Sequence, residues 1–179
     1  MRNIYCVFTF LFMAILLSGC GGSSVNTPNL PVTKQFQFNG VDNFTLSQAY
    51  NTSIIYHTED EMRDMLNEKI TGLLEEKGLL SDDKNMDTLK IQVDYYRVFL
   101  GEATFAKTES LGHPHGTFIV EITNNKNVTL RKIVKNNLVY TGGFLGNLQG
   151  LTGYRDKSKE VDFIQGFVNS IVETIEELD

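Results

Sequence analysis

The chain has 179 residues, of which 16 are basic and 22 are acidic, for a formal net charge of −6 at pH 7. The length fits one domain with a proper core. The acidic balance argues against nucleic-acid binding and against electrostatic docking of the domain on anionic lipid. The two cysteines, Cys6 and Cys20, both lie near the start. Beyond Cys20 the sequence therefore excludes a disulfide, a thiol enzyme, a Cys-ligated zinc site and an iron–sulfur cluster.

Residues 1–19 have the pattern of an export signal that is cleaved from the mature protein. Arg2 supplies the positive start, and Ile4 to Leu17 is a nearly unbroken apolar run. A membrane-spanning helix needs about 20 apolar residues, so this run fits the apolar segment of a signal peptide better. The small residues Ser18 and Gly19 follow at the expected cleavage point.

The stretch Leu17-Ser18-Gly19-Cys20 resembles the lipobox of bacterial lipoproteins. The resemblance implies that the thiol of Cys20 receives a diacylglycerol, that cleavage precedes this residue, and that the new amine is then acylated, as with palmitate. It also implies a lipid anchor in the cell membrane. Because Gly21 rather than Asp follows Cys20, the anchor is expected at the periplasmic face of the outer membrane if the source is Gram-negative. The alternative is an ordinary signal peptide with a chance cysteine.

Residues 20–33 are expected to form the lipidated N-terminus and a flexible linker, because small and polar residues dominate and no apolar period is present. Residues 34–179 are expected to form a single domain. Within it, Gln35 to Phe38 alternates as a short first strand, residues 40–43 form a turn, and Thr52 to Tyr56 is a candidate second strand.

A long helix is predicted to begin after Thr58 and to end at Gly78. Thr58 can cap it, and Glu61, three residues later, completes a capping box. Gly78 suits the left-handed position that follows a last helical turn. Apolar side chains at helical spacing predict the buried face, namely Met62, Met65, Leu66, Ile70, Leu73 and Leu74.

Alternation of apolar and polar residues predicts the next strands. One strand places Leu89, Ile91, Val93 and Tyr95 on one face, and its phase slips near Arg97, which indicates a bulge or a ligand-facing edge. Another strand follows with Phe118, Val120 and Ile122 on one face. Residues 124–127 are the predicted turn to a hairpin partner at residues 128–134, and residues 138–140 continue that partner or begin a further strand.

Residues 141–154 combine five glycines with Phe144, Leu145, Leu148, Leu151 and Tyr154. Such a segment is either a mobile apolar lip over a pocket or a loop packed onto the sheet, and packing is favoured because loose apolar loops are costly in water. A last amphipathic helix begins at Asp156 or Ser158. The order of elements predicts an α+β fold, a two-layer sandwich with a mainly antiparallel sheet and two amphipathic helices packed on one face.

The sequence offers few groups for chemistry. His113-Pro114-His115 has a spacing that can chelate zinc or copper, but no third ligand is evident, so a turn is favoured over a metal site. The glycines match neither a P-loop nor a Rossmann spacing, and no serine lies in a nucleophile elbow. We therefore predict no catalytic residue, no metal and no cofactor, with Cys20 as the one assigned site and the ligand-binding residues unknown.

A second resemblance covers residues 58–178. These residues are similar to the YajG-type lipoproteins of enteric bacteria in Leu73-Leu74-Glu75-Glu76-Lys77-Gly78, Leu89-Lys90-Ile91-Gln92-Val93, the turn at 124–127, Gly143-Phe144, Asn169-Ser170-Ile171 and Thr174-Ile175. The resemblance implies the same α+β order and a lipid anchor, and the long glycine-rich loop departs from it. It implies no activity.

These patterns lead to two main hypotheses and a weaker third. The first is a membrane-anchored, non-enzymatic binding or accessory protein of the bacterial cell envelope, with a protein or glycan partner and no nucleic acid. The alternative is a small carrier of an apolar, lipid-like ligand in a pocket under residues 141–154. The third is a hydrolase of envelope polymers, for which the sequence offers no nucleophile or base.

Overall fold

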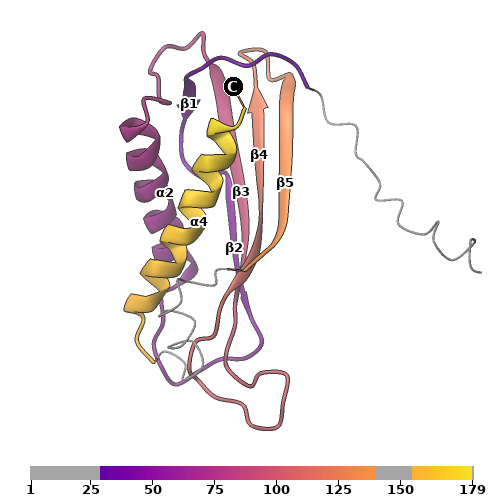
Figure 1. Ribbon diagram of the computed structural model, residues 1–179. Coiled ribbons are helices and arrows are strands. Elements are labelled where there is room, and N and C mark those ends of the chain that lie inside the picture. Colours follow the sequence, from indigo (N-terminus) through magenta and orange to yellow (C-terminus); the bar gives the residue numbers. More distant parts are fainter. Residues whose placement is uncertain (1–28, 140–154, 179) are drawn as a thin grey trace, which may run out of the picture.

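The computed structural model describes residues 29–139 and 155–178, which form a five-stranded sheet covered on one face by two helices (Figure 1). The elements follow in the order β1 (Phe36–Phe38), β2 (Asn43–Gln48), α2 (Glu59–Glu76), β3 (Asp87–Arg97), β4 (His115–Thr123), β5 (Thr129–Val139) and α4 (Ser158–Glu176). The predicted α+β class and the placement of both helices on one face are confirmed. Within the described residues, no helix is long and apolar enough to span a membrane.

The sheet is mixed. β3, β4 and β5 are antiparallel neighbours, whereas β1 and β2 both pair parallel with β3, on its other side. β2, α2 and β3 form a crossover unit, in which a helix returns the chain to a parallel neighbouring strand. The parallel pairing arises because the chain passes through α2 between β2 and β3, and alternation alone cannot show the direction of a neighbouring strand.

β1 and β2 act as one interrupted edge strand along β3. The interruption lies at Gly40, which has φ of +106°, and the backbone N–H of Val41 donates there to Oδ1 of Asn67 on α2 at 2.7 Å. The predicted strand at residues 52–56 is wrong, because β2 occupies Asn43–Gln48 instead. The apolar side chains that suggested it, Ile54 and Tyr56, pack from a loop onto a separate aromatic cluster.

The core lies between the sheet and the helices. Alternate residues of β3 and β4 are buried as predicted, and the helices supply the opposing layer. The side chains from these four elements that form this core are Met62, Leu66, Ile70, Leu74, Leu89, Ile91, Val93, Tyr95, Phe118, Val120, Ile122, Ile164, Phe167, Val168, Ile171, Val172 and Ile175. Burying apolar area contributes about 25 cal/mol per Å², so this layer supplies most of the stability.

The predicted boundaries of the first helix are confirmed. The Thr58 hydroxyl accepts from the Glu61 backbone N–H at 3.2 Å, and the Glu61 carboxylate accepts from the Thr58 N–H at 2.7 Å. These bonds hold the pKa of Glu61 below its usual range. Gly78 follows the helix with φ of +67°, as expected for its left-handed position.

The strands separate two ends of the domain (Figure 1). One end, which we call the turn end, carries the loop at residues 77–86, the turn at residues 124–128 and the end of α4. The other, the long-loop end, carries the connections at residues 49–58 and 98–114. Residues near the start of the domain join it at the turn end, where the backbone N–H of Leu30 donates to the Leu130 carbonyl at 3.2 Å.

The predicted linker extends to Thr33, and its last residues make defined contacts. Arg131 Nε donates to the Leu30 carbonyl at 2.9 Å, and the Thr33 N–H donates to the Asp87 carboxylate at 2.8 Å. Asn29 also bridges Arg131 in the antiparallel sense. The chain is therefore attached to the edge of β5 from Asn29 onward, which leaves residues 20–28 as the part of the predicted linker outside the described residues.

The contact between Gly116 and α4 generates a test of the packing. A Cβ on Gly116 would lie 2.7 Å from Cζ of Phe167 and 2.5 Å from the Asp94 carbonyl. We expect Gly116→Ala to destabilise the domain by about 1–3 kcal/mol, because the ring and a neighbouring strand must move. Gly72→Ala is the matched control, since nothing lies within 4 Å of its Cβ and alanine favours a helix by about 0.5–1 kcal/mol. Urea unfolding that shows equal effects for both variants would contradict this account.

Candidate functional site

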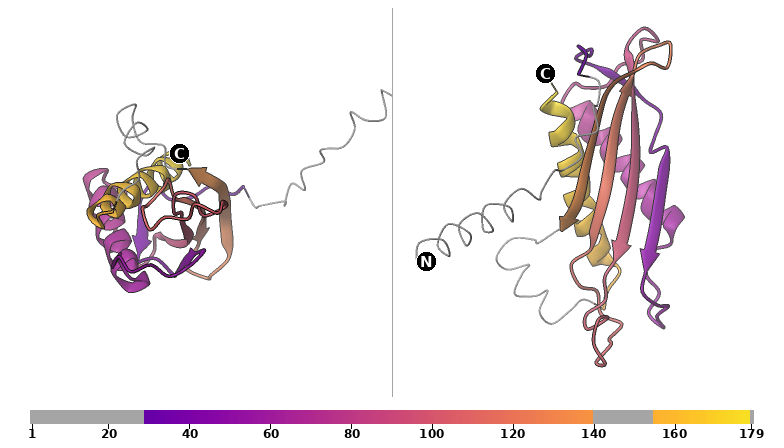
Figure 2. Two further views of the ribbon diagram at one scale, coloured as in Figure 1. Left: turned by 90° about the horizontal axis from the view of Figure 1, so that it is seen from below. Right: turned by 90° about the vertical axis from the view of Figure 1, so that its right-hand side faces the viewer.

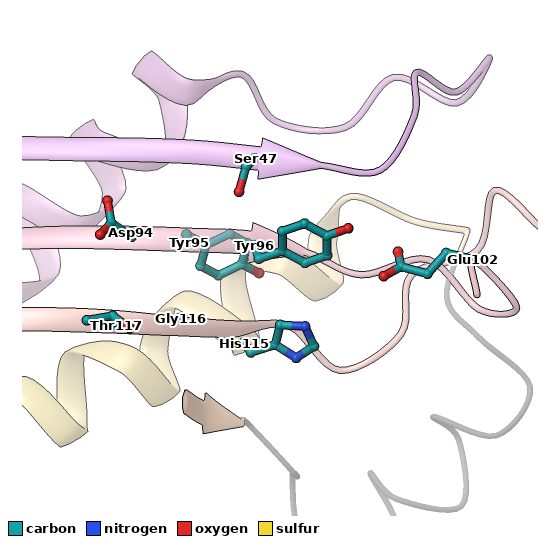
Figure 3. A pocket seen from close by; sticks show the side chains of 8 residues that line it. All are labelled: Ser47, Asp94, Tyr95, Tyr96, Glu102, His115, Gly116 and Thr117. Carbon is teal, nitrogen blue, oxygen red and sulfur yellow. The ribbon is translucent and has the colours of Figure 1, made fainter. Parts of the chain in front are cut away.

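Polar and aromatic side chains that could contact a ligand or a partner gather at the long-loop end. The sheet face that the helices leave uncovered has a hollow of about 390 Å³ there, lined by Ser47, Asp94, Tyr95, Tyr96, Glu102, His115, Gly116 and Thr117. We call it the open-face hollow. Figure 3 shows its side chains arriving from three adjacent strands and from the loop that follows β3. The hollow is open and is lined by both polar groups and aromatic rings, so it suits a surface group of a partner better than an enclosed small molecule.

An aromatic pair forms one wall of the open-face hollow. The rings of Tyr96 and His115 face each other across the β3–β4 pairing, with centroids 5.3 Å apart and planes 9° apart. The Glu102 side chain points toward the Tyr96 hydroxyl (Figure 3). Burial, and then the negative charge of Glu102, raise the pKa of the Tyr96 phenol, so it is a hydrogen-bond donor at neutral pH.

The loop after β3 carries Glu102 to the hollow by a set of internal bonds. The Glu102 carboxylate accepts from the Phe99 N–H at 2.9 Å, and Phe99 bridges Leu111 on the returning arm of the loop. Gly101, with φ of +72°, allows the turn, because a Cβ there would lie 2.3 Å from the Ala106 carbonyl. The tip of this tightly bonded loop presents Phe105, whose side chain is fully exposed.

A small aromatic cluster packs against the inner side of the loop after β3. It consists of Tyr56, Phe99, Leu111 and Phe163, with Tyr50 and Ile54 packed against it. The Tyr50 hydroxyl donates to the Thr108 carbonyl at 2.5 Å, and the Tyr56 hydroxyl donates to the Glu109 carbonyl at 2.6 Å. The loop is therefore fixed from two neighbouring segments.

The two histidines of the His113-Pro114-His115 motif, for which the sequence favours a turn over a metal site, do not converge. His115 lies on the uncovered face against Tyr96, whereas His113 lies edge-on to Phe163 of α4 with ring centroids 6.4 Å apart. Among the residues that the structure describes, no group of three or more His, Cys, Asp or Glu side chains could hold a metal ion. Two predicted features, Cys20 and the segment at residues 141–154, lie outside the described residues, so the lipid carrier stays a prediction.

A buried ion pair lies next to this end of the core. Arg97, the last residue of β3, donates from Nε to the Glu160 carboxylate at 2.6 Å, and the Glu160 side chain is 0% exposed. The other Glu160 oxygen lies 2.9 Å from both the backbone nitrogen and Nδ1 of His57. The remaining guanidinium nitrogens donate to Gln48 Oε1 at 2.7 Å and to the His57 carbonyl at 2.5 Å. Every charge of the pair is thus hydrogen-bonded, as burial requires.

The ion pair also borders a second hollow, of about 450 Å³, on the β2 side of the domain. Its wall is formed by the end of β2, the segment before α2 and Arg97. Tyr56 lies there with its ring 5.4 Å from the Arg97 guanidinium carbon. Burial, and then the charge of Glu160, raise the pKa of Tyr56. The Arg97 charge is used internally, so this hollow offers a mixture of polar and apolar groups with the Glu59 carboxylate at its wall.

The sequence reasoning missed Arg97 and Glu160. The predicted phase slip near Arg97 is wrong, because the alternation of β3 continues through Arg97, which is buried on the core face, and the strand then ends. Glu160 precedes Ile164 and Val168 at intervals of four, so it lies on the buried face of α4. A charged residue at a core position in two separate elements was the available signal for a buried pair.

Comparisons with known proteins place the chain near few others. No family model matches it, and no curated protein matches it. A solved structure of a minor lipoprotein from Acinetobacter baumannii is similar, with 14% sequence identity and a TM-score of 0.40, covering 82% of this chain and 94% of that one. A likeness at this level carries no argument about function.

The ion pair is tested by a double-mutant cycle. We expect Arg97→Met alone or Glu160→Gln alone to destabilise the domain by about 3–5 kcal/mol, because each leaves a buried charge without its partner. The double variant Arg97→Met/Glu160→Gln should cost less than the sum of the two single variants, since no uncompensated charge remains. Lys84→Met, at an exposed lysine of the loop after α2, is the control and should change the free energy of unfolding by under about 0.5 kcal/mol. Additive effects of the two substitutions in urea unfolding would refute the coupling.

Proposed function

We propose that the chain is a lipid-anchored protein of the bacterial cell envelope that acts by binding a partner, a protein or a glycan, through its long-loop end. The lipobox resemblance at residues 17–20 supports the anchor. The placement of the loops supports the binding end, because segments that carry recognition commonly lie on loops held by a rigid scaffold.

One observation carries the proposal. The open-face hollow and the exposed Phe105 share the end of the domain opposite to the residues that join the tether. The strands of 11 residues that separate the two ends span about 35 Å. A partner can therefore reach the hollow while the tether stays attached to the bilayer.

The chemistry of the hollow indicates what a partner would offer. Asp94 is exposed beside the aromatic pair, and Ser47 and Thr117 add hydroxyl groups. Carboxylates next to aromatic rings favour hydroxyl-bearing or amine-bearing groups, which accept both a polar contact and a ring face. Phe105 would add an apolar anchor beside this polar contact, as in many binding surfaces.

The anchor is tested at Cys20. The wild-type product from its native host should begin at Cys20 and carry the mass of its acyl groups, and it should remain with the membrane fraction after a salt wash. Cys20→Ala should lose both the added mass and the membrane retention, because the acyl chains of the diacylglycerol and of the acylated amine together supply the attachment. A wild-type product with an unmodified Cys20, or with residues 1–19 still present, would overturn the anchor.

The binding end is tested by crosslinking in intact cells. A photo-reactive residue at Phe105 should capture a defined envelope component, whereas the same residue at exposed Lys84 of the turn end should not. Asp94→Asn and His115→Ala should weaken that capture about tenfold or more, as loss of a good polar contact does. Gln92→Ala is the control, since Gln92 is exposed on the same face of β3 outside the hollow. Equal capture from both ends would count against the proposed binding end.

A further inference from the structure

The edge strand β5 differs in charge from the rest of the protein. Residues 124–139 contain Lys126, Arg131, Lys132 and Lys135 and no acidic residue, in a chain whose formal net charge is −6. The helix α2, which lies toward the opposite edge of the sheet, contains seven acidic and two basic residues. Figures 1 and 2 show α2 and β5 on opposite sides of the domain. The segment that includes β5 is therefore net positive, whereas α2 toward the opposite edge is net negative.

The same edge carries exposed apolar side chains. Among the residues that the structure describes, six large hydrophobic side chains are exposed, and four of them, Leu30, Val128, Val134 and Val139, lie on β5 or directly beside its start. Val134 pairs with Ile119 on the uncovered face of the sheet, next to the Lys132–Glu121 pair. Basic and apolar groups thus alternate along one edge, which is the composition that favours the interface of an anionic bilayer.

The tether leads to this edge. Leu30 and Asn29 are joined to Leu130 and Arg131 at the start of β5. Eight residues, 21–28, separate Cys20 from Asn29, and a flexible linker of that length, as the sequence predicts, has an end-to-end distance of about 15–20 Å. An anchored Cys20 therefore keeps β5 within that distance of the headgroups, at a high effective concentration.

We infer that β5 and its flanking residues are a membrane-docking edge, which rests on the anionic phospholipid headgroups of the bilayer that holds the acyl chains. The inference rests on the proposed anchor at Cys20. The anchor makes docking effectively intramolecular, so a contact too weak to hold a free protein suffices to orient the tethered one. The acidic α2 then faces away from the bilayer, and the open-face hollow, whose His115 pairs with Val139 at the end of β5, opens sideways next to the docking edge. The net charge of the whole chain argues against docking on anionic lipid, but it is the sum over a basic edge and an acidic edge and therefore does not describe β5 alone.

The orientation is measured on the full-length, acylated protein in vesicles. Cys20 is acylated, so a cysteine placed at Val134 is the single free thiol of the mature chain and can carry a fluorophore. A cysteine at exposed Glu68 of α2 is the matched control. In vesicles of phosphatidylethanolamine and phosphatidylglycerol that contain nitroxide-headgroup lipid, the label at 134 should be quenched at least about threefold more than the label at 68, because a nitroxide quenches only fluorophores that come close to it.

The same quenching measurement is repeated with the charge of the lipid changed and with the charge of β5 changed. Replacing phosphatidylglycerol with phosphatidylcholine, or introducing Lys132→Gln and Lys135→Gln together, should reduce the excess quenching at 134, since each positive charge near the surface contributes about fivefold to the docking equilibrium. Both lysines are peripheral, so the variant should fold, as circular dichroism would verify. Equal quenching of the labels at 134 and 68 would overturn the proposal that β5 docks on the bilayer. Quenching at 134 that does not change with the charge of the lipid would overturn it as well.

Two other outcomes are distinct. Protein that does not float with any vesicle would show that the anchor itself fails, and the docking edge with it. A zero-length crosslink from Lys135 to a protein strand instead of to lipid in cells would assign β5 to a protein partner and overturn the lipid assignment. Capture at Phe105 is measured at the other end of the domain and is unaffected by either result.

Discussion

The ion pair between Arg97 and Glu160 is the interaction on which the arrangement of the long-loop end depends. A carboxylate with no exposure to water would lose several kcal/mol of hydration without a partner. The structure compensates by bringing His57 and Arg97 to Glu160, and the Gln48 side chain accepts a further hydrogen bond from Arg97. These residues come from the end of β2, the segment before α2, the end of β3 and the start of α4. The four segments must therefore meet at one point before the charges are satisfied.

This meeting point determines where the loops of the long-loop end lie. The His57 carbonyl accepts from Arg97, and its neighbour Tyr56 donates to the Glu109 carbonyl on the loop after β3. Tyr56 also packs on Phe99, whose N–H is held by Glu102. Glu102 in turn reaches the open-face hollow. A continuous set of contacts thus leads from the buried charge to the surface hollow, so the loop that carries Phe105 rests on a rigid support rather than on solvent.

The regular elements could be predicted because their signals are local. The capping box of Thr58 and Glu61, the glycine after α2 and the alternation of β3 and β4 each depend on residues close together in the chain, and each is confirmed. The second strand was misplaced because Ile54 and Tyr56 are apolar for a different reason, the packing of a loop on Phe99. The parallel pairing of β1 and β2, the Arg97–Glu160 pair and the open-face hollow all join residues distant in sequence. No local sequence pattern shows which distant residues come together. A charged residue at a predicted core position does, however, indicate that a buried partner is needed.

The chemistry of an edge strand limits how deep β5 can dock. An edge strand presents unpaired backbone N–H and carbonyl groups along one side, and exposed edges of this kind promote unwanted pairing unless charges blunt them. Arg131, Lys132 and Lys135 supply such charges. In the hydrocarbon of a bilayer each unpaired backbone group would cost several kcal/mol, whereas water in the headgroup layer satisfies it. The basic side chains prefer that same layer. Both terms place β5 among the headgroups, where Val134 and Val139 can reach the acyl boundary while the backbone of the strand stays hydrated.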